Sequence, residues 1–175
     1  MAIGGAPAPG DDNPIGAAGL LVGEEFRVDS RARAGVEGAM KLRLDHIAIA
    51  VEDIRAAVAQ FEEKLGLACE KVEEVPAQQA VVAFFALGDA HLELVAPTDP
   101  TSSVARSLQK RGEGLHHLCF EVPSLDASVT ALKEKGVQIA SEPKPGAGGS
   151  RVAFVHPKSM NGVLVELVEK PSSAC

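Results

Sequence analysis

The sequence contains no tryptophan and no tyrosine, and phenylalanine occurs only six times. Because exposed aromatic rings are what stack on nucleobases, this composition argues against nucleic-acid binding as the main function. Acidic residues outnumber basic residues by 24 to 17, giving a net charge of −7. Such a charge also argues against a general binder of nucleic acids or of anionic membrane surfaces. No apolar run approaches the roughly 20 residues that span a bilayer, so we expect no membrane segment.

Cysteine is also scarce. The three cysteines, Cys69, Cys119 and Cys175, are widely spaced and form no CxxC motif. An odd, scattered set excludes a disulfide framework and fits a reducing compartment, so we expect a cytoplasmic protein. Cys119 stands in an apolar, strand-like stretch and is expected to be a core residue, because free cysteine is usually buried.

The N-terminal segment lacks any hydrophobic periodicity. Its first 23 residues are dominated by alanine, glycine, proline and aspartate, a composition typical of disorder. It also lacks the basic start and apolar core of a secretory signal. We predict a disordered extension over residues 1–40, a single domain over 41–170 and a frayed tail over 171–175. Alternatively, Met40 is the natural start and the preceding residues are an upstream extension.

The rest of the chain repeats itself once. His117, in the string GLHHLCFEV, lies 71 residues after His46, in LDHIAIAV. Glu166, in VLVELV, lies 73 residues after Glu93, in HLELV. Both copies place a helical pattern between these points, so the chain is predicted to contain two copies of one unit.

Alternation and helical spacing predict the same elements in both copies. Helices are expected after Asp53 and Ser124, which are good N-caps, and are expected to end at Gly66 and Gly136. Strands are predicted at 42–51, 68–75, 81–87, 91–95, 115–122, 137–140, 151–155 and 163–168. A connector with a short helix at about 103–110 separates the copies, and the Gly- and Pro-rich stretch 141–150 is predicted to be a loop. The predicted fold class is α+β, with two paired βαβββ modules (about 42–96 and 114–169) forming a curved mixed sheet around a metal-centred cleft.

Each module offers one histidine on its first strand and one glutamate on its last. These four residues, His46, Glu93, His117 and Glu166, occupy matched positions of the repeat. Burying two imidazoles and two carboxylates without a cation is costly. Mixed nitrogen and oxygen ligands suit a divalent ion such as Co²⁺, Mn²⁺, Zn²⁺ or Ni²⁺. We therefore predict one divalent metal site. The neighbouring His116 is expected to point to the opposite face of its strand, because side chains alternate along a strand, and to serve in packing or in support of the metal ligands.

These strings resemble a known family. The sequence from about Leu42 to Lys170 resembles the vicinal oxygen chelate superfamily, and within it the methylmalonyl-CoA epimerases. The resemblance rests on LDHIAIAVEDI, GDAHLELVAPT, GLHHLCFEV and FVHPKSMNGVLVELVE, and on the VP-x-Q string that ends at Gln78. Glyoxalase I, a relative with a similar ligand set, usually has a DPDG-like turn before the final strand instead.

The resemblance implies metal-dependent epimerisation of (2R)- and (2S)-methylmalonyl-CoA. The C2 proton would be removed by a carboxylate at the metal, with Glu166 as the candidate base, and the enolate charge would be stabilised by the metal. It also implies an acyl-CoA thioester as partner and a homodimer as assembly. Candidate substrate-binding residues are Gln78 and, for the anionic CoA tail, Lys144, Arg151 and Lys158.

The sequence also departs from the family pattern. Epimerases often have Glu-Gln-Gly-Val where this chain has Ala77-Gln78-Gln79-Ala80, and Val82 stands where some members place a catalytic glutamate. The second acid or base is therefore unidentified. Two alternatives stay open at this point. One is a glyoxalase I-like lyase or another metalloenzyme of the superfamily, such as a ring-cleaving dioxygenase. The other is a non-catalytic module that sequesters small molecules such as antibiotics.

Overall fold

A computed structural model describes residues 40–146 and 149–171. The extension predicted over residues 1–40 therefore lies, except for Met40, outside the described residues. The same holds for residues 172–175 of the predicted tail. All described residues belong to one of the two units into which the chain divides, residues 39–175. No helix in the described ranges is long and apolar enough to cross a bilayer.

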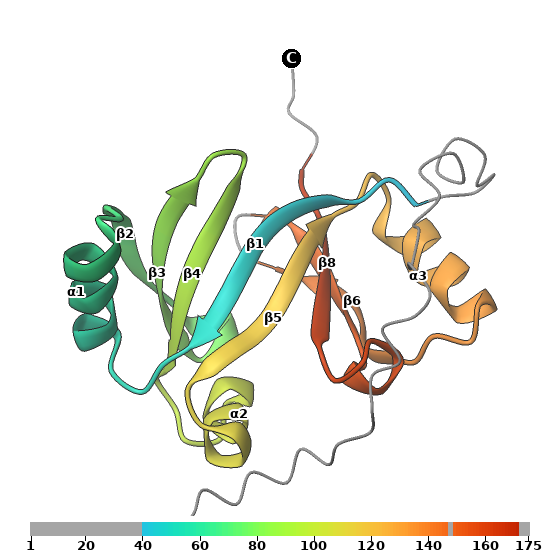
Figure 1. Cartoon of the computed structure of the whole chain (residues 1–175). Helices are drawn as coiled ribbons and strands as arrows, with labels where there is room; N and C mark the ends of the chain where they lie inside the picture. Colours follow the sequence, from blue (N-terminus) through green and yellow to red (C-terminus); the bar gives the residue numbers. More distant parts are fainter. Residues whose placement is uncertain (1–39, 147–148, 172–175) are drawn as a thin grey trace, which may run out of the picture. The chain divides into compact units, whose positions relative to one another are not determined.

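The described residues form eight strands in one sheet and three α-helices (Figure 1). The strands are β1 (Arg43–Ala50), β2 (Cys69–Val75), β3 (Ala80–Leu87), β4 (Ala90–Pro97), β5 (Gly114–Glu121), β6 (Ile139–Pro145), β7 (Arg151–Val155) and β8 (Leu164–Glu169). The helices are α1 (Ile54–Leu65), α2 (Ser103–Arg111) and α3 (Leu125–Glu134), with short 3-10 turns η2 (Pro76–Gln78) and η4 (Pro157–Ser159). The predicted α+β fold with paired βαβββ modules is confirmed.

The sheet joins the two modules at its centre. The strand order is β2-β3-β4-β1-β5-β8-β7-β6, and β1 pairs with β5 in antiparallel fashion. Within each module the first and last strands, β1 with β4 and β5 with β8, run parallel. The sheet is therefore mixed, and the first strands of both modules lie side by side (Figure 1). This arrangement brings the two halves of the repeat together at the middle of the sheet.

Local sequence signals set where the helices begin. The Asp53 carboxylate accepts hydrogen bonds from the amides of Arg55 and Ala56 at the start of α1. Gly66 ends this helix in a left-handed conformation, with a φ of 68°, which glycine adopts without steric cost. In the second module the Ser124 hydroxyl caps α3. The two predicted N-caps are thus confirmed.

The strand β1 separates two environments by simple alternation. Ala48 and Ala50 are buried in a cluster with Val82, Val95 and Val104 of α2. The intervening Ile47 and Ile49 pack into a second cluster that includes Phe85 and residues of α1. One face of β1 thus packs toward α1, while the other carries two alanines that pack near α2, together with His46.

The prediction of a loop over residues 141–150 is wrong for its first half. Residues up to Pro145 continue β6, where Lys144 pairs with Val152 and Pro145 pairs with Arg151. Proline cannot donate to a ladder, but β6 is an edge strand, and its register shifts twice along β7. Edge strands and bulges are where a sheet tolerates proline.

Candidate metal centre and active site

The strand register places the four predicted ligands on one face of the sheet. Ala48 pairs with Glu93 on one side and with His117 on the other. Two residues farther along β5 from His117, Cys119 pairs with His46 of β1 on one side and with Glu166 of β8 on the other. Ala48 and Cys119 are fully buried and small, so each leaves room between the histidine and the glutamate in its row.

Three of the four predicted ligands converge closely. His46 Nε2 lies 2.9 Å from His117 Nε2, and His117 Nε2 lies 2.9 Å from Glu166 Oε2. The separation between His46 Nε2 and Glu166 Oε2 is 3.9 Å. One ligand atom from each residue falls within 4.8 Å of the others, a spacing that fits a single metal ion.

Because the carboxylate of Glu166 is buried, the group of His46, His117 and Glu166 would be stabilised by a nearby cation. Glu166 is only 4% exposed and His117 is 8% exposed. The ion-pair partners of Glu166 among the described residues are the two histidines, with no lysine or arginine. A buried carboxylate without a full counter-charge is strongly unfavourable. The donor set of two imidazoles and a carboxylate therefore fits a divalent cation.

Glu93 lies beside this group rather than within it. Its Oε1 approaches Nδ1 of His46 at 3.5 Å, which is the nitrogen that faces away from His117. Burial raises the pKa of the Glu93 carboxyl, and the nearby His46 and His117 partly oppose this effect. The two modules thus present their glutamates differently, although the sequence pattern treats them alike.

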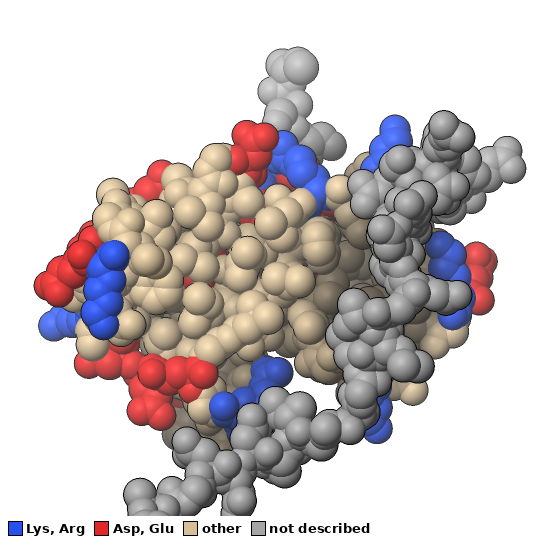
Figure 2. Space-filling view, viewed as in Figure 1, with Lys and Arg blue, Asp and Glu red and all other residues tan. Residues whose placement is uncertain are grey.

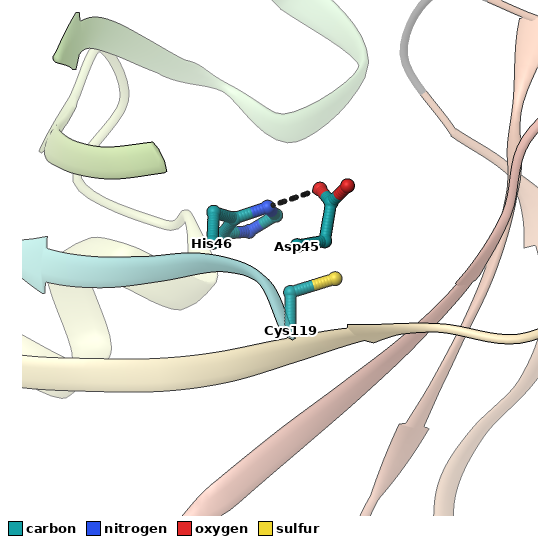
Figure 3. Close-up of side chains that lie close together, drawn as sticks. All are labelled: Asp45, His46 and Cys119. Carbon is teal, nitrogen blue, oxygen red and sulfur yellow. Dashed lines mark hydrogen bonds and ion pairs between the residues drawn. The ribbon is translucent and has the colours of Figure 1, made fainter. Parts of the chain in front are cut away.

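Asp45 is a site residue that the sequence analysis missed. Its Oδ2 lies 2.9 Å from Nδ1 of His46, and Oδ1 forms an ion pair with Lys170. These contacts hold the pKa of the Asp45 carboxyl well below its usual range, with the His46 hydrogen bond as the largest cause. Figure 3 shows its carboxylate beside the His46 ring and near the Cys119 thiol. Burial raises the pKa of this thiol far above its usual value.

A β-bulge explains why Asp45 was missed. The register between β1 and β5 shifts between Leu44 and His46, so Asp45 is an extra residue in the ladder. Strict alternation would send neighbouring side chains to opposite faces, but a bulge re-aims one of them. Asp45 therefore shares the face of His46.

The supporting role expected for His116 agrees with its position in a second bulge. A second register shift, between Ala48 and Ile49 of β1, leaves His116 of β5 as the extra residue. Its Nδ1 lies 2.8 Å from Nδ1 of His117, and the two rings meet edge to face. The pKa of His116 is lowered to about 4, chiefly by burial. His116 is thus a buried neighbour of His117 that contacts its ring without lining the cleft.

A cleft of about 800 Å³ opens over this centre. Its lining combines the four predicted ligands with apolar, acidic and basic side chains: Arg43, Asp45, His46, Val75, Gln78, Val82, Phe84, Glu93, Val95, His117, Glu121, Val122, Pro123, Ser150, Val152, Glu166, Val168, Glu169, Lys170 and Pro171. This volume suits a small-molecule substrate.

On the face shown in Figure 2, charged side chains lie mainly around the margin of an uncharged centre, without one basic patch.

The four predicted substrate contacts have different surroundings. Gln78 lines the cleft, whereas Lys144, Arg151 and Lys158 are not among its lining residues. The Arg151 guanidinium makes a two-pronged ion pair with Asp126, at 2.7 and 2.9 Å. The Lys144 ammonium lies 5.5 Å from the centre of the Phe154 ring. Lys158 is in the short turn η4, where its amide donates to the ring of His156.

Residues 45–154 match the family model for the glyoxalase/bleomycin resistance protein/dioxygenase superfamily. This match runs from within β1 to within β7, and it includes three of the four predicted ligands, His46, Glu93 and His117. The chain belongs to this superfamily. The chain is also 41% identical over 128 residues to an ethylmalonyl-CoA/methylmalonyl-CoA epimerase of Cereibacter sphaeroides, covering 71% of this chain and 96% of the relative.

Two further comparisons point the same way. Human mitochondrial methylmalonyl-CoA epimerase is 41% identical over 127 residues, covering 71% of this chain and 72% of the human protein. A solved structure of a methylmalonyl-CoA epimerase in complex with methylmalonyl-CoA and ammonium superimposes with a TM-score of 0.69 and 34% identity. That match covers 77% of this chain and 97% of the solved chain. The resemblance to the methylmalonyl-CoA epimerases seen in the sequence is confirmed.

Proposed function

We propose that this protein is a metal-dependent methylmalonyl-CoA epimerase, which interconverts the (2R) and (2S) forms of its substrate. The observation that carries the proposal is the convergence of His46, His117 and Glu166 within one cleft of a chain 41% identical to such epimerases. The substrate would be an acyl-CoA thioester, as in the relatives whose names specify it. We further propose that the protein is a cytoplasmic homodimer.

In this proposal His46, Glu93, His117 and Glu166 hold one divalent ion, such as Co²⁺, Mn²⁺, Zn²⁺ or Ni²⁺. When bound, the ion supplies Lewis acidity that stabilises negative charge on the thioester oxygen. Glu93 is the most distant of the four, since its carboxylate faces Nδ1 of His46 and not the nitrogen that faces His117. Its contribution to ion binding should accordingly be weaker than that of Glu166.

Glu166 is the proposed base. The C2 hydrogen of methylmalonyl-CoA is acidic because it lies between a thioester and a carboxylate. The Glu166 carboxylate lies in the cleft, where Val82 and Val168 offer apolar surface. A carboxylate beside an apolar wall, at the proposed metal site, would be suited to take this proton and return it. Val82 cannot supply the second acid or base, so inversion requires another group in the cleft.

Gln78 is the proposed contact for the acyl end of the substrate, since it lines the cleft. Lys144, Arg151 and Lys158 remain proposed contacts for the phosphates of CoA. Because they do not line the cleft, they would act only on the part of CoA that extends beyond it. Arg151 would have to leave Asp126, or bind phosphate through the edge that Asp126 does not use.

Incubation of the purified protein with one epimer of methylmalonyl-CoA in D₂O tests the proposal. The expected result is formation of the other epimer with deuterium at C2, and loss of both processes after chelation of the metal. The glutathione hemithioacetal of methylglyoxal, the substrate of a glyoxalase I-like lyase, is the matched control. Turnover of this compound without epimerisation would contradict the proposal.

A further inference from the structure

The two predicted histidine ligands have the same backbone arrangement in both modules, but different neighbours at Nδ1. Asp45 precedes His46, and His116 precedes His117; each preceding residue is the extra residue of a bulge between β1 and β5. In each pair the preceding side chain contacts Nδ1 of the ligand, at 2.9 Å for Asp45 and 2.8 Å for His116. The two bulges thus repeat with the modules, and each turns a second side chain toward a ligand ring.

We infer that Asp45 and His116 are paired positioning residues, which fix the ring orientation and tautomer of His46 and His117. The inference deepens the proposed function, because it rests on these two histidines binding a metal ion. It concerns residues outside the predicted ligand set, and it predicts that the two modules contribute unequally to ion affinity.

The chemistry of imidazole determines where each ring carries its proton. A ring nitrogen that binds a cation must be unprotonated, so a neutral ligand histidine carries its proton on the other nitrogen. The Nε2 atoms of His46 and His117 lie 2.9 Å apart; when both bind the proposed ion, both rings carry their proton on Nδ1. Each Nδ1–H then needs an acceptor, and a fixed acceptor determines both the tautomer and the ring orientation.

For His46 that acceptor is the Asp45 carboxylate. The competing acceptor, Glu93 Oε1, is farther from Nδ1, at 3.5 Å against 2.9 Å. Asp45 is itself held by the ion pair with Lys170, which also contacts Glu121 at 3.4 Å. An ionised acceptor makes a stronger hydrogen bond than a neutral one and increases the basicity of the ring.

For His117 the acceptor is a second imidazole. Its Nδ1–H can donate to Nδ1 of His116 only if His116 is neutral and carries its own proton on Nε2. His116 is 7% exposed, and burial disfavours its charged form. Because this acceptor is neutral, the bond to His117 should be the weaker of the two.

Substitution by asparagine and by leucine separates the hydrogen bond from the space that each residue fills. The two side chains have nearly the same shape, but only asparagine offers an acceptor oxygen. The four variants are Asp45→Asn, Asp45→Leu, His116→Asn and His116→Leu. The matched control is Glu121→Gln, which removes a carboxylate that shares Lys170 with Asp45 but does not contact His46.

The first measurement is the affinity for Zn²⁺, determined by competition with a chromophoric chelator. Loss of an outer hydrogen-bond partner typically weakens metal binding about 10- to 100-fold. We expect Asp45→Leu near the upper end of this range and His116→Leu near the lower end. Both asparagine variants should recover part of the loss, and Glu121→Gln should bind as the wild type does.

The second measurement is NMR of the zinc-loaded, ¹⁵N-histidine-labelled protein. The wild type should show two slowly exchanging Nδ1–H protons, from His46 and His117. Asp45→Leu should lose only the His46 signal, and His116→Leu should lose only the His117 signal. Circular dichroism identifies a variant that fails to fold, in which case the asparagine variant at that position decides the matter by keeping its signal.

Unchanged zinc affinity and both protected protons in the two leucine variants would overturn the inference. Equal losses in Asp45→Asn, Asp45→Leu and Glu121→Gln would also overturn it, because the effect would then be one of charge alone. These outcomes are separate from failure of the proposed function. A wild-type protein that binds zinc but does not epimerise methylmalonyl-CoA would refute the substrate and leave the positioning test intact.

Discussion

The Nε2 atoms of His46 and His117 lie 2.9 Å apart, although 71 residues separate them in the chain. They come from equivalent positions of β1 and β5, the two strands that join the modules. Neither module alone supplies both ligand histidines, because His46 belongs to the first module and His117 to the second. The site is therefore a product of the pairing between modules.

His46→Ala should abolish stoichiometric metal binding. The substitution removes one of three side chains whose ligand atoms lie within 4.8 Å of one another. Elemental analysis after loading should give about one ion per chain for the wild type, as a single site implies, and far less for the variant. Retention of one ion per chain by His46→Ala would refute the ligand assignment.

Glu166→Gln should lose most epimerisation while still binding some metal. The amide keeps the shape and one ligand oxygen of the side chain, but it cannot act as a base. Removal of a general base lowers the rate by on the order of 10²-fold or more. The measurement is exchange of the C2 proton with D₂O, followed separately for each epimer. Exchange of both epimers near the wild-type rate would leave Glu166 as a ligand only.

The metal-free protein should lose stability on acidification because of His116. The pKa of His116 is lowered from 6.5 to about 4 by burial, so the unfolded state binds the proton first. The free energy of unfolding therefore decreases as the pH falls from 6.5 to about 4, by about 3 kcal/mol for the full shift. His116→Asn should remove this loss in urea titrations at pH 7 and pH 4.5.

The raised pKa of His46 acts in the opposite direction in the same protein. Its stabilising contribution is complete below the unfolded value of 6.5 and is lost as the pH rises through the folded-state pKa. The comparison with His116→Asn isolates the His116 contribution, since His46 titrates in both proteins. An acid-induced loss that is equal in both proteins would contradict the prediction.

Leu125→Ala should destabilise the fold by about 2–5 kcal/mol, the usual range for a buried leucine. Leu125 is fully buried at the start of α3, in the core of the second module. Its counterpart in the repeat is Ile54 of α1, which is only partly buried. Ile54→Ala should therefore cost less. Urea unfolding monitored by circular dichroism measures both values, and equal losses would contradict this asymmetry.

Deletion of residues 1–39 should leave the melting temperature and the epimerase activity nearly unchanged. This prediction rests on the composition of the segment, since these residues lie outside the described ranges. Met40 is retained because it packs against the core of the second module. A large drop in either quantity would show that the segment supports the fold or the site.

The repeat made much of this protein predictable from sequence alone. Matched strings identified two modules, and the caps at Asp53 and Ser124 placed two helices correctly. The alternation that predicted β1 is also seen in its side chains, since His46 lines the cleft and Ile47 packs into the core. These features depend on neighbours a few residues apart, whose geometry is fixed by local backbone sterics and hydrogen bonding.

Other features were decided only by pairing between distant strands. The bulges that turn Asp45 and His116 toward the ligand histidines exist because β1 and β5 pair with extra residues in their ladder. The last residues of β6 are extended because they pair with β7. Glu93 and Glu166 hold equivalent sequence positions but approach different ring nitrogens of their histidines. A sequence pattern encodes the periodicity of one strand, whereas register and bulges arise only when two strands meet.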